Sequence, residues 1–298
     1  MRIPDGRLLA SASCRNRGDF LCRQGEIIIW NTSTWQHLIT LTDHTDEVLG
    51  LTWNTDGSRL ASASWDGTVI IWDAFTWQPL VTLTDHNDFV SNVAWNADGS
   101  QLASTSRFAL SIWDTVSWQP LAELAGSGPI AWKTDGSQLA TRSALFDAGI
   151  IIWDTTNWQQ LTTLDGHIDT IMSMAWNSNQ LVSASWDSTI IIWDTNRWQR
   201  LNTLSDHTAA ITSVAWNTKG NQLASASRDA TVIITEYGDS VAQNCDMARR
   251  NFSWDEWQNT FPTNLIRSFV RNGQVHPSVP IENLYQPKGN CVEQNLNR

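Results

Sequence analysis

Short runs of β-branched, aromatic and hydroxyl residues, separated by turns of Asn, Asp, Gly and Ser, fill the first part of the chain. In a representative unit these runs cover 48–53, 59–64, 68–73 and 78–84. Val, Ile, Leu, Trp and Thr suit a pleated, half-buried surface, and the intervening residues supply the backbone geometries that hairpins need. The pattern therefore predicts four short strands per unit and no helix between residues 1 and 236.

The four-strand unit repeats with a period of about 40 residues. The third strand of five units ends in a tryptophan, at spacings of 42, 41, 40 and 40: Trp30, Trp72, Trp113, Trp153 and Trp193. One period later, Thr235 takes the tryptophan position. Four of the units also contain a histidine at a fixed position, nine residues before a second, regularly spaced tryptophan at the end of the first strand: His44, His86, His167 and His207. The chain is an array of one repeated supersecondary unit.

The units begin with DH or GH, carry DG in the middle and end in IWD in four cases. Over about residues 3–236 this pattern resembles the WD40 repeat family. The resemblance implies an all-β fold, a β-propeller of about six four-stranded blades around a central channel. In that family a histidine, a serine or threonine, an aspartate and the tryptophan form a buried hydrogen-bond network in each blade. Carried over, the complete tetrads are His44, Ser62, Asp66 and Trp72, and His167, Ser183, Asp187 and Trp193.

Serine, histidine and aspartate are also the parts of a hydrolase triad. Here the constellation occurs complete in two units and in part elsewhere, whereas a catalytic centre needs to exist once. Buried histidine and aspartate side chains require partners to offset their desolvation, and each unit supplies them. No GxxxxGK[ST], GxGxxG, HExxH, CxxC or GxSxG motif is present. We interpret the tetrads as structural and expect no enzyme, no cofactor and no metal site.

Two units depart from the pattern in a way that bears on rigidity. The third unit has no aspartate in its turn SRFALS, and the fourth has no histidine while keeping Thr141, Asp147 and Trp153. Loss of one partner leaves other buried polar groups unsatisfied, at a cost of about 1–3 kcal/mol. We predict that the third and fourth units are less rigid than the second and fifth, unless water or local rearrangement compensates.

Both ends of the repeat array are incomplete. The first unit starts midway through the pattern at IPDGRLLASAS, without an innermost strand, and continues into the 12-residue insertion CRNRGDFLCRQG. The last unit has no recognisable outer strand. Two interpretations stay open: a six-bladed ring with an imperfect seam, or the C-terminal portion of a longer propeller.

Residues 237–298 form a tail of different composition. The sequence SWDE is a capping-box pattern in which Ser253 caps a short helix at about 254–261, ended by Pro262. Trp254, Trp257 and Phe261 give this helix one apolar face, which we expect to cover an end or the seam of the propeller. The segment resembles one that closes many bacterial WD40 chains. We expect residues 263–298 to be loosely ordered.

In WD40 proteins, partners usually meet the face formed by the loops entering the innermost strands and the turns after the second strands. The resemblance assigns to that face Glu47, Leu49, Trp65, Phe89, Ser91, Thr170, Met172, Trp186, Ala210, Thr212 and Arg228. Trp65 and Trp186 stand out, since exposed tryptophans are enriched at binding hot spots.

A second regular set lies five residues after each blade tryptophan: Trp35, Trp77, Trp118, Trp158 and Trp198. Two interpretations stay open for it, an aromatic girdle for a partner or glycan and packing inside each hairpin.

Composition narrows the possible partners. The formal net charge of −11 and the three scattered lysines oppose binding to a phosphate backbone. No apolar run reaches the roughly 20 residues that span a bilayer, and the N-terminus has no secretory h-region. The four cysteines are too few for a disulfide-built fold. We expect a cytoplasmic chain with free thiols, in which Cys14 and Cys22 would bridge only after export.

Together these features predict a non-enzymatic protein-interaction scaffold or sensor module, part of or derived from a bacterial signalling protein. The alternative is a propeller that binds a small ligand or glycan through exposed tryptophans. We expect no nucleic-acid or membrane partner. A propeller fold by itself does not determine a function.

Overall fold

The computed structural model describes residues 1, 3–14, 17–18, 21–22, 24–144 and 148–237. These residues form 24 strands and, within the described part, no helix. The strands make six antiparallel sheets of three or four strands and one two-stranded ribbon. The predicted tail helix at 254–261 and Asp147 lie outside the described residues.

Each sheet is one blade, and blades 2 to 5 have four strands in sequential order. Blade 2 contains β6 (Val48–Trp53), β7 (Arg59–Ser64), β8 (Val69–Asp73) and β9 (Pro79–Leu83). Blade 3 contains β10 (Asn92–Trp95), β11 (Gln101–Thr105), β12 (Ala109–Asp114) and β13 (Pro120–Ala125). Blade 4 contains β14 (Ser127–Trp132), β15 (Gln138–Arg142), β16 (Gly149–Asp154) and β17 (Gln160–Asp165). Blade 5 contains β18 (Ile171–Asn177), β19 (Gln180–Ser185), β20 (Ile190–Asp194) and β21 (Gln199–Leu204).

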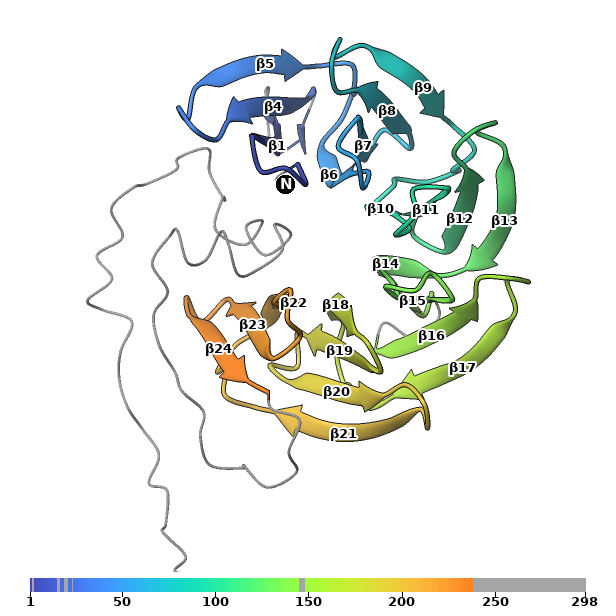
Figure 1. The fold of residues 1–298 in the computed structure, drawn as a ribbon, viewed down its shortest axis with the longest axis vertical. Helices are drawn as coiled ribbons and strands as arrows, with labels where there is room; N and C mark the ends of the chain where they lie inside the picture. The colour runs from blue at the N-terminus through green and yellow to red at the C-terminus, as the bar shows by residue number, and fades with distance from the viewer. Residues whose placement is uncertain (2, 15–16, 19–20, 23, 145–147, 238–298) are drawn as a thin grey trace, which may run out of the picture.

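The two terminal blades have three strands each. Blade 1 contains β1 (Leu8–Cys14), β4 (Gly25–Asn31) and β5 (His37–Leu41), and blade 6 contains β22 (Ile211–Trp216), β23 (Gln222–Ser227) and β24 (Val232–Glu236). The six blades are arranged radially around a common centre, with blades 1 and 6 at the two ends of the series (Figure 1). The predicted propeller architecture is confirmed in these blades.

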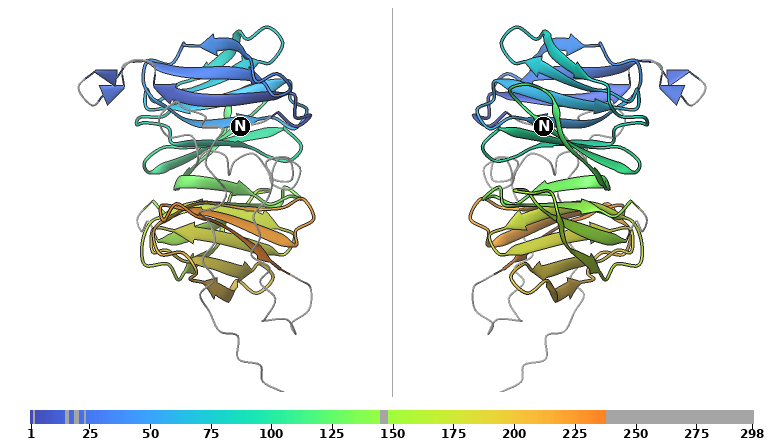
Figure 2. Two further views of the ribbon diagram at one scale, coloured as in Figure 1. Left: turned by 90° about the vertical axis from the view of Figure 1, so that its left-hand side faces the viewer. Right: turned by 90° about the vertical axis from the view of Figure 1, so that its right-hand side faces the viewer.

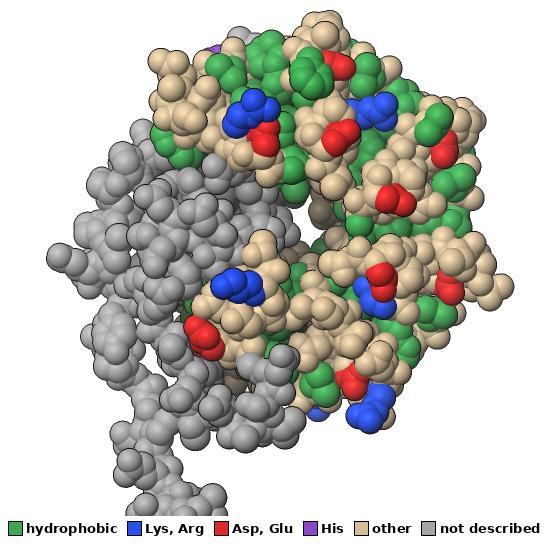
Figure 3. Space-filling model, viewed as in Figure 1, with side chains coloured by type: hydrophobic (Ala, Val, Ile, Leu, Met, Phe, Trp, Pro, Cys, Tyr) green, Lys and Arg blue, Asp and Glu red, His purple; other side chains and the backbone are tan. Residues whose placement is uncertain are grey.

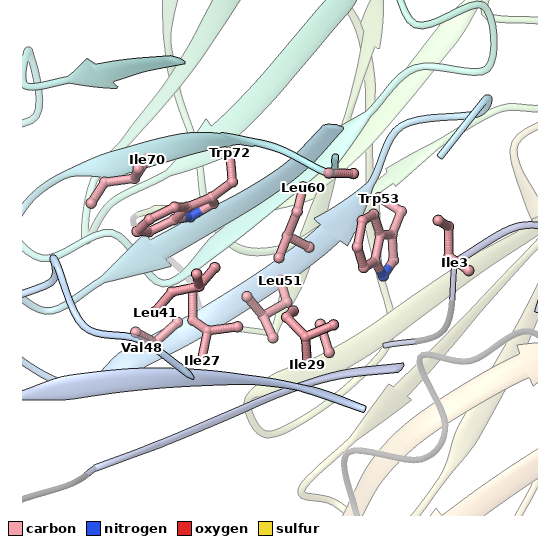
Figure 4. Close-up of a cluster of buried hydrophobic side chains, with 12 residues drawn as sticks. Ile3, Ile27, Ile29, Leu41, Val48, Leu51, Trp53, Leu60, Ile70 and Trp72 are labelled. Atoms are coloured by element: carbon pink, nitrogen blue, oxygen red, sulfur yellow. The ribbon is translucent and has the colours of Figure 1, made fainter. Parts of the chain in front are cut away.

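The hydrophobic core lies between neighbouring blades. Within blade 2, Leu60 pairs with Trp53 on one side and Trp72 on the other, so three large side chains form a row across the sheet. This row packs against Ile27 and Ile29 of blade 1 (Figure 4). Because both faces of a blade are covered, its middle strands are buried almost throughout, whether apolar as in β8 or serine-containing as in β7.

Residues ahead of β1 partly replace the missing inner strand of blade 1. The backbone nitrogen of Ala10 donates to the carbonyl of Met1 at 2.7 Å, and that of Ile3 donates to the carbonyl of Leu8 at 2.9 Å. The Met1 carbonyl also accepts a bond from the indole Nε1 of Trp53 at 3.0 Å. Met1 thus joins blade 1 to blade 2.

The insertion in blade 1 forms a ribbon of β2 (Arg17–Gly18) and β3 (Leu21–Cys22), which projects from the blades (Figure 2). A disulfide joins Cys14 to Cys22, with their Cα atoms 5.7 Å apart. The expectation of free thiols at these two positions was wrong. The reason is local geometry: Cys22 pairs with Arg17 across the ribbon, which returns the chain to the end of β1 within bridging distance.

No helix in the described ranges is both long and apolar enough to cross a membrane.

Candidate functional site

The blade 2 tetrad forms one continuous hydrogen-bond network. Ser62 Oγ lies 2.8 Å from His44 Nε2, and Trp72 Nε1 donates to the same oxygen at 2.9 Å. On the other side of the ring, His44 Nδ1 lies 2.8 Å from Asp66 Oδ2. The backbone nitrogen of Thr45 donates to that carboxylate oxygen at 2.9 Å. The network ties the loop entering β6 to the turn after β7.

Blade 5 repeats this geometry. His167 lies 2.8 Å from both Ser183 and Asp187, and Trp193 donates to Ser183 at 2.9 Å. In both blades the serine is fully buried, so its hydroxyl is closed off from a substrate. Such burial is unlike the exposed, strained turn that displays a nucleophilic serine in hydrolases.

The carboxylates of these networks are held in the charged form. Burial alone would raise the pKa of Asp66, but hydrogen bonds from His44 and Thr68 outweigh it and lower that pKa to about 2. In blade 6, burial likewise opposes the bonds from Thr231 and His207 that lower the pKa of Asp229 to about 2.

The incomplete blades keep the part of the network that their residues allow. In blade 3, His86 Nε2 lies 2.7 Å from Ser104 Oγ, which accepts a bond from Trp113 at 2.8 Å. Burial lowers the pKa of His86 to about 4, against an opposing effect of Asp85.

Blades 4 and 6 also keep part of the network. In blade 4, Trp153 Nε1 donates to Thr141 Oγ1 at 3.2 Å. In blade 6, His207 lies 2.8 Å from both Ser225 and Asp229, and Thr235 takes the position of the tryptophan. The lower rigidity of blades 3 and 4 stays a prediction.

The sequence-assigned partner face is built by equivalent backbone bonds. The nitrogen of each turn residue after the second strand donates at 2.9 Å to a carbonyl in the loop entering the inner strand of the same blade: Trp65 to Glu47, Trp186 to Thr170, and Arg228 to Ala210. Two further residues of the set donate through their hydroxyls to a carbonyl in the second strand of their own blade. Ser91 donates to the Thr105 carbonyl and Thr212 to the Ala226 carbonyl, both at 3.2 Å. Leu49 and Met172 are half-buried.

Aromatic side chains on this face pair across blade boundaries, which sequence spacing does not reveal. The ring of Trp65, 50% exposed, stacks on that of Phe89 from the next blade, with centroids 5.1 Å apart and planes inclined by 18°. The guanidinium of Arg228 lies 5.0 Å from the ring centre of Trp186, which is 39% exposed. Blades 2–3 and blades 5–6 therefore each present an exposed aromatic cluster.

Acidic residues are frequent in the segments that build this face. The loops that enter the inner strands, and the strand end just before one of them, carry exposed or half-buried carboxylates: Asp43, Asp46, Asp85, Asp88, Asp165, Asp169 and Asp206. On the molecular face shown in Figure 3, basic and acidic side chains are interspersed over the described blades without a basic stripe. The described residues hold no group of three or more acidic, histidine or cysteine side chains placed to bind a metal.

The second tryptophan set lies in the turns between third and fourth strands, at φ between 55° and 59° in all five cases. Trp77, Trp118 and Trp158 pack edge-on against an inner-strand tryptophan of their own blade, with ring centroids about 6 Å apart. Four of the five are half-buried, and Trp35 of blade 1 is 45% exposed. The rings therefore serve packing inside each blade more than a continuous exposed girdle.

The repeated four-stranded sheets around one centre define a β-propeller, and the histidine–aspartate networks mark it as one built from tryptophan–aspartate repeats. The repeat profile described as WD domain, G-beta repeat matches residues 35–73, 77–114, 158–194 and 198–235, just over half of the chain. The chain belongs to the WD40 repeat family. The unmatched part between residues 114 and 158 includes the loop that lacks the histidine. No curated protein matches the chain.

Proposed function

We propose that this chain is a non-enzymatic protein-binding module. WD40 domains generally serve as protein-interaction scaffolds and are typically non-catalytic. The observation that carries the proposal is the pair of exposed aromatic clusters on one face, Trp65 with Phe89 and Trp186 with Arg228. Exposed tryptophan is costly to leave in water and is the residue most enriched at binding hot spots.

The charge around the clusters selects the class of partner. Acidic residues lie in the neighbouring loops, and the histidine–aspartate contacts hold these loops against the turns that carry Trp65 and Trp186. A protein surface with arginine or lysine side chains would complement these carboxylates and could stack its guanidinium groups on the aromatic rings. The proposed partner is therefore a protein with a basic contact surface.

A place in a bacterial signalling protein is the part of this proposal that rests on the resemblance alone, and the cytoplasmic location expected from the sequence is not carried into it. The Cys14–Cys22 disulfide argues for an oxidising compartment, because cytoplasmic thiols are usually kept reduced. Glycan binding is the less favoured function, since most of the regularly spaced tryptophans are packed inside their blades.

The test compares partner retention by three forms of the chain. The immobilised protein is incubated with lysate of its own cells, and retained proteins are identified by mass spectrometry. We expect Trp65→Ala combined with Trp186→Ala to abolish retention of a specific partner. Trp35→Ala is the matched control, because Trp35 is similarly exposed but lies in a turn between third and fourth strands. Retention that survives the double substitution and is lost in the control would contradict the proposed face.

A further inference from the structure

The outermost described strand of blade 6, β24, has an edge with no paired strand among the described residues. β24 pairs with β23 on one side, whereas the third strands of blades 1 to 5 also pair with a fourth strand. It lies on the outer side of its blade (Figure 1). Its residues 232–235 read VIIT, all β-branched, and suit a strand interior. The backbone groups along such an edge are a template for a further strand.

Side-chain burial in blade 6 is incomplete at the same place. Val232 and Ile233 are half-buried, whereas the equivalent Val69 and Ile70 of blade 2 are 0% and 4% exposed. In blade 2, Val69 pairs with Leu83, the last residue of the fourth strand, which is itself buried. A strand that completes blade 6 therefore needs a large apolar residue opposite Val232.

The sequence directly after β24 does not have the pattern of an outer strand. In blades 2, 3 and 4, the turn after the third strand carries a tryptophan that packs edge-on against the inner-strand tryptophan. In blade 6, Tyr237 makes this contact with Trp216, with ring centroids 5.7 Å apart, and serine takes the turn position at 240. Residues 242–246, at the outer-strand position, read AQNCD and contain no leucine.

A segment further along the tail does have this pattern. The five outer strands share leucine at their second and fifth positions: HLITL (37–41), PLVTL (79–83), PLAEL (120–124), QLTTL (160–164) and RLNTL (200–204). In the sequence of 238–298, leucine or isoleucine stands three residues before a leucine at one place, PIENL (280–284), which begins with proline as two of the outer strands do. Residues 280–284 lie outside the described residues, so the match is one of sequence.

The structure gives each position of the pattern a role. In blade 2, Pro79 pairs with Trp72 and Val81 with Ile71, so Leu80 is the extra residue of a β-bulge and is 50% exposed. The same register shift occurs in all five outer strands. Proline is tolerated because the strand is at an edge. Polar residues are accepted between the two leucines, as the exposed glutamate of PLAEL shows.

We propose that residues 280–284 bind the unpaired edge of β24 as the fourth strand of blade 6. Carried over from blade 2, the register gives one bulge residue, Ile281, and four pairs: Pro280 with Thr235, Glu282 with Ile234, Asn283 with Ile233, and Leu284 with Val232. Leu284 then covers the end of the blade beside Val232. For these five residues the proposal replaces the loose order expected of residues 263–298.

The tail is favoured over a second copy of the chain as the occupant. Residues 238–279 connect β24 to the segment, and a flexible chain of that length spans roughly 35 Å, about twice the length of a five-residue strand. Such a tether holds the segment at an effective concentration on the order of millimolar, above that of a second copy in dilute solution. The edge is separate from the loops and turns of the partner face, so this inference does not rest on the proposed function.

Hydrogen exchange of the full chain, followed by mass spectrometry, tests the occupancy of the edge. The blade 5 strands serve as references, because β20 has paired strands on both sides and β21 on one. We expect the number of slowly exchanging amides in β24 to match β20 rather than β21. The measurement is repeated at two chain concentrations tenfold apart, and the result should not change.

Variants assign the protection to the segment. We expect Leu284→Asp to accelerate exchange in β24 at least tenfold, and Leu284→Met to restore slow exchange. Leu296→Asp is the matched control, since it places the same charge elsewhere in the tail. Thermal melting verifies that each variant is folded. Fast exchange of the β24 edge in the unsubstituted chain, protection that rises with concentration, or an equal effect of Leu296→Asp would each overturn the proposal.

A cross-link checks the register independently. Ile233→Cys and Asn283→Cys are combined in a chain carrying Cys245→Ser and Cys291→Ser, with the Cys14–Cys22 bridge kept. Directly opposite residues of an antiparallel pair lie within disulfide distance, so we expect an intramolecular bond to form at least tenfold faster than with Cys at Asn290 in place of Asn283. Equal rates for the two positions, or a disulfide-linked dimer as the main product, would contradict the proposed strand.

Discussion

The indole of Trp77 packs edge-on against that of Trp53, with ring centroids 6.1 Å apart, although Trp77 holds the left-handed φ of 59°. Such a backbone conformation costs on the order of 1 kcal/mol for a residue other than glycine. The contact with the inner strand offsets that cost. The repeated tryptophan in this turn therefore links the outer hairpin of a blade to its innermost strand.

Substitution in this turn separates strain from packing. We expect Trp77→Ala to lower the free energy of unfolding by about 2 kcal/mol, because the ring contact is lost while the strained φ remains. Trp77→Gly should cost about 1 kcal/mol less, since glycine adopts this φ readily. Urea denaturation followed by tryptophan fluorescence measures both.

Trp35 provides the matched control for this pair. It has the same backbone conformation, with φ of 55°, but its side chain is 45% exposed. Trp35→Gly should leave the free energy of unfolding within about 0.5 kcal/mol of the original or raise it. If Trp35→Gly destabilises the chain as much as Trp77→Gly, packing on the inner strand is not what the tryptophan contributes.

The buried serine of a tetrad predicts a larger loss. Ser62→Ala removes the acceptor of Trp72 Nε1 and the partner of His44 Nε2 at once. Two buried polar groups are then unsatisfied, so we expect the free energy of unfolding to fall by about 2–4 kcal/mol. The exposed Ser33→Ala should change it by less than about 0.5 kcal/mol. A small effect of Ser62→Ala would mean that the network is satisfied by other groups and does not stabilise the blade.

Sequence patterns could predict the blades because their determinants are local. The pattern of strand and turn residues within one period predicts strands at 68–73 and 78–84. The structure has β8 at Val69–Asp73 and β9 at Pro79–Leu83, within about a residue of these ranges. The contacts of Ser62 with His44 follow from the family pattern in the same way. These features repeat, and repetition makes them visible in a single sequence.

Features that join different blades escaped sequence reasoning. The stack of Trp65 on Phe89 depends on the angle between blades 2 and 3, which no periodicity encodes. The bond from Trp53 to the Met1 carbonyl crosses from blade 2 to the residues ahead of β1. The disulfide at Cys14 was missed because it depends on a hairpin inside a unique insertion, where the repeat offers no template.

The histidine of blade 3 predicts a pH dependence of stability. Burial lowers the pKa of His86 to about 4 in the folded chain, against an ordinary value of 6.5. Between these two pH values the unfolded chain therefore binds more protons at His86 than the folded chain does. The free energy of unfolding falls as the pH drops from about 6.5 to 4, and the contribution of neutral His86 to stability is complete only above about 6.5. The lowered pKa of Asp66 adds a second loss between about 4 and 2, since its stabilisation is lost as the carboxylate is protonated.

Urea denaturation at a series of pH values between 7.5 and 4.5 tests the histidine. His86→Gln should flatten the slope of unfolding free energy against pH, whatever its effect at pH 7.5. The slope should not disappear, because burial also lowers the pKa of His167. An unchanged slope in the His86→Gln variant would exclude His86 as a source of the acid sensitivity.

The disulfide predicts a local response to reduction. The bridge spans eight positions and closes a ribbon of two two-residue strands that projects from blade 1 (Figure 2). A ribbon of this length is not stable by itself, so it should open when the Cys14–Cys22 bridge is broken. If only the ribbon opens on reduction, we expect the free energy of unfolding of the whole propeller to fall by less than about 1 kcal/mol. A disulfide that closes a loop of this size would contribute about 2–3 kcal/mol if the loop stayed ordered without it.

Two measurements check this. Alkylation of the denatured chain should label two more thiols after reduction than before it, as read by mass. Trypsin should cleave after Arg17 much faster in the reduced chain, while the rest of the propeller stays intact. The variant carrying Cys14→Ser and Cys22→Ser should behave like the reduced chain under oxidising conditions. If reduction instead lowers the global unfolding free energy by about 3 kcal/mol without faster cleavage at Arg17, the ribbon is held by its own packing and the bridge stabilises the whole propeller.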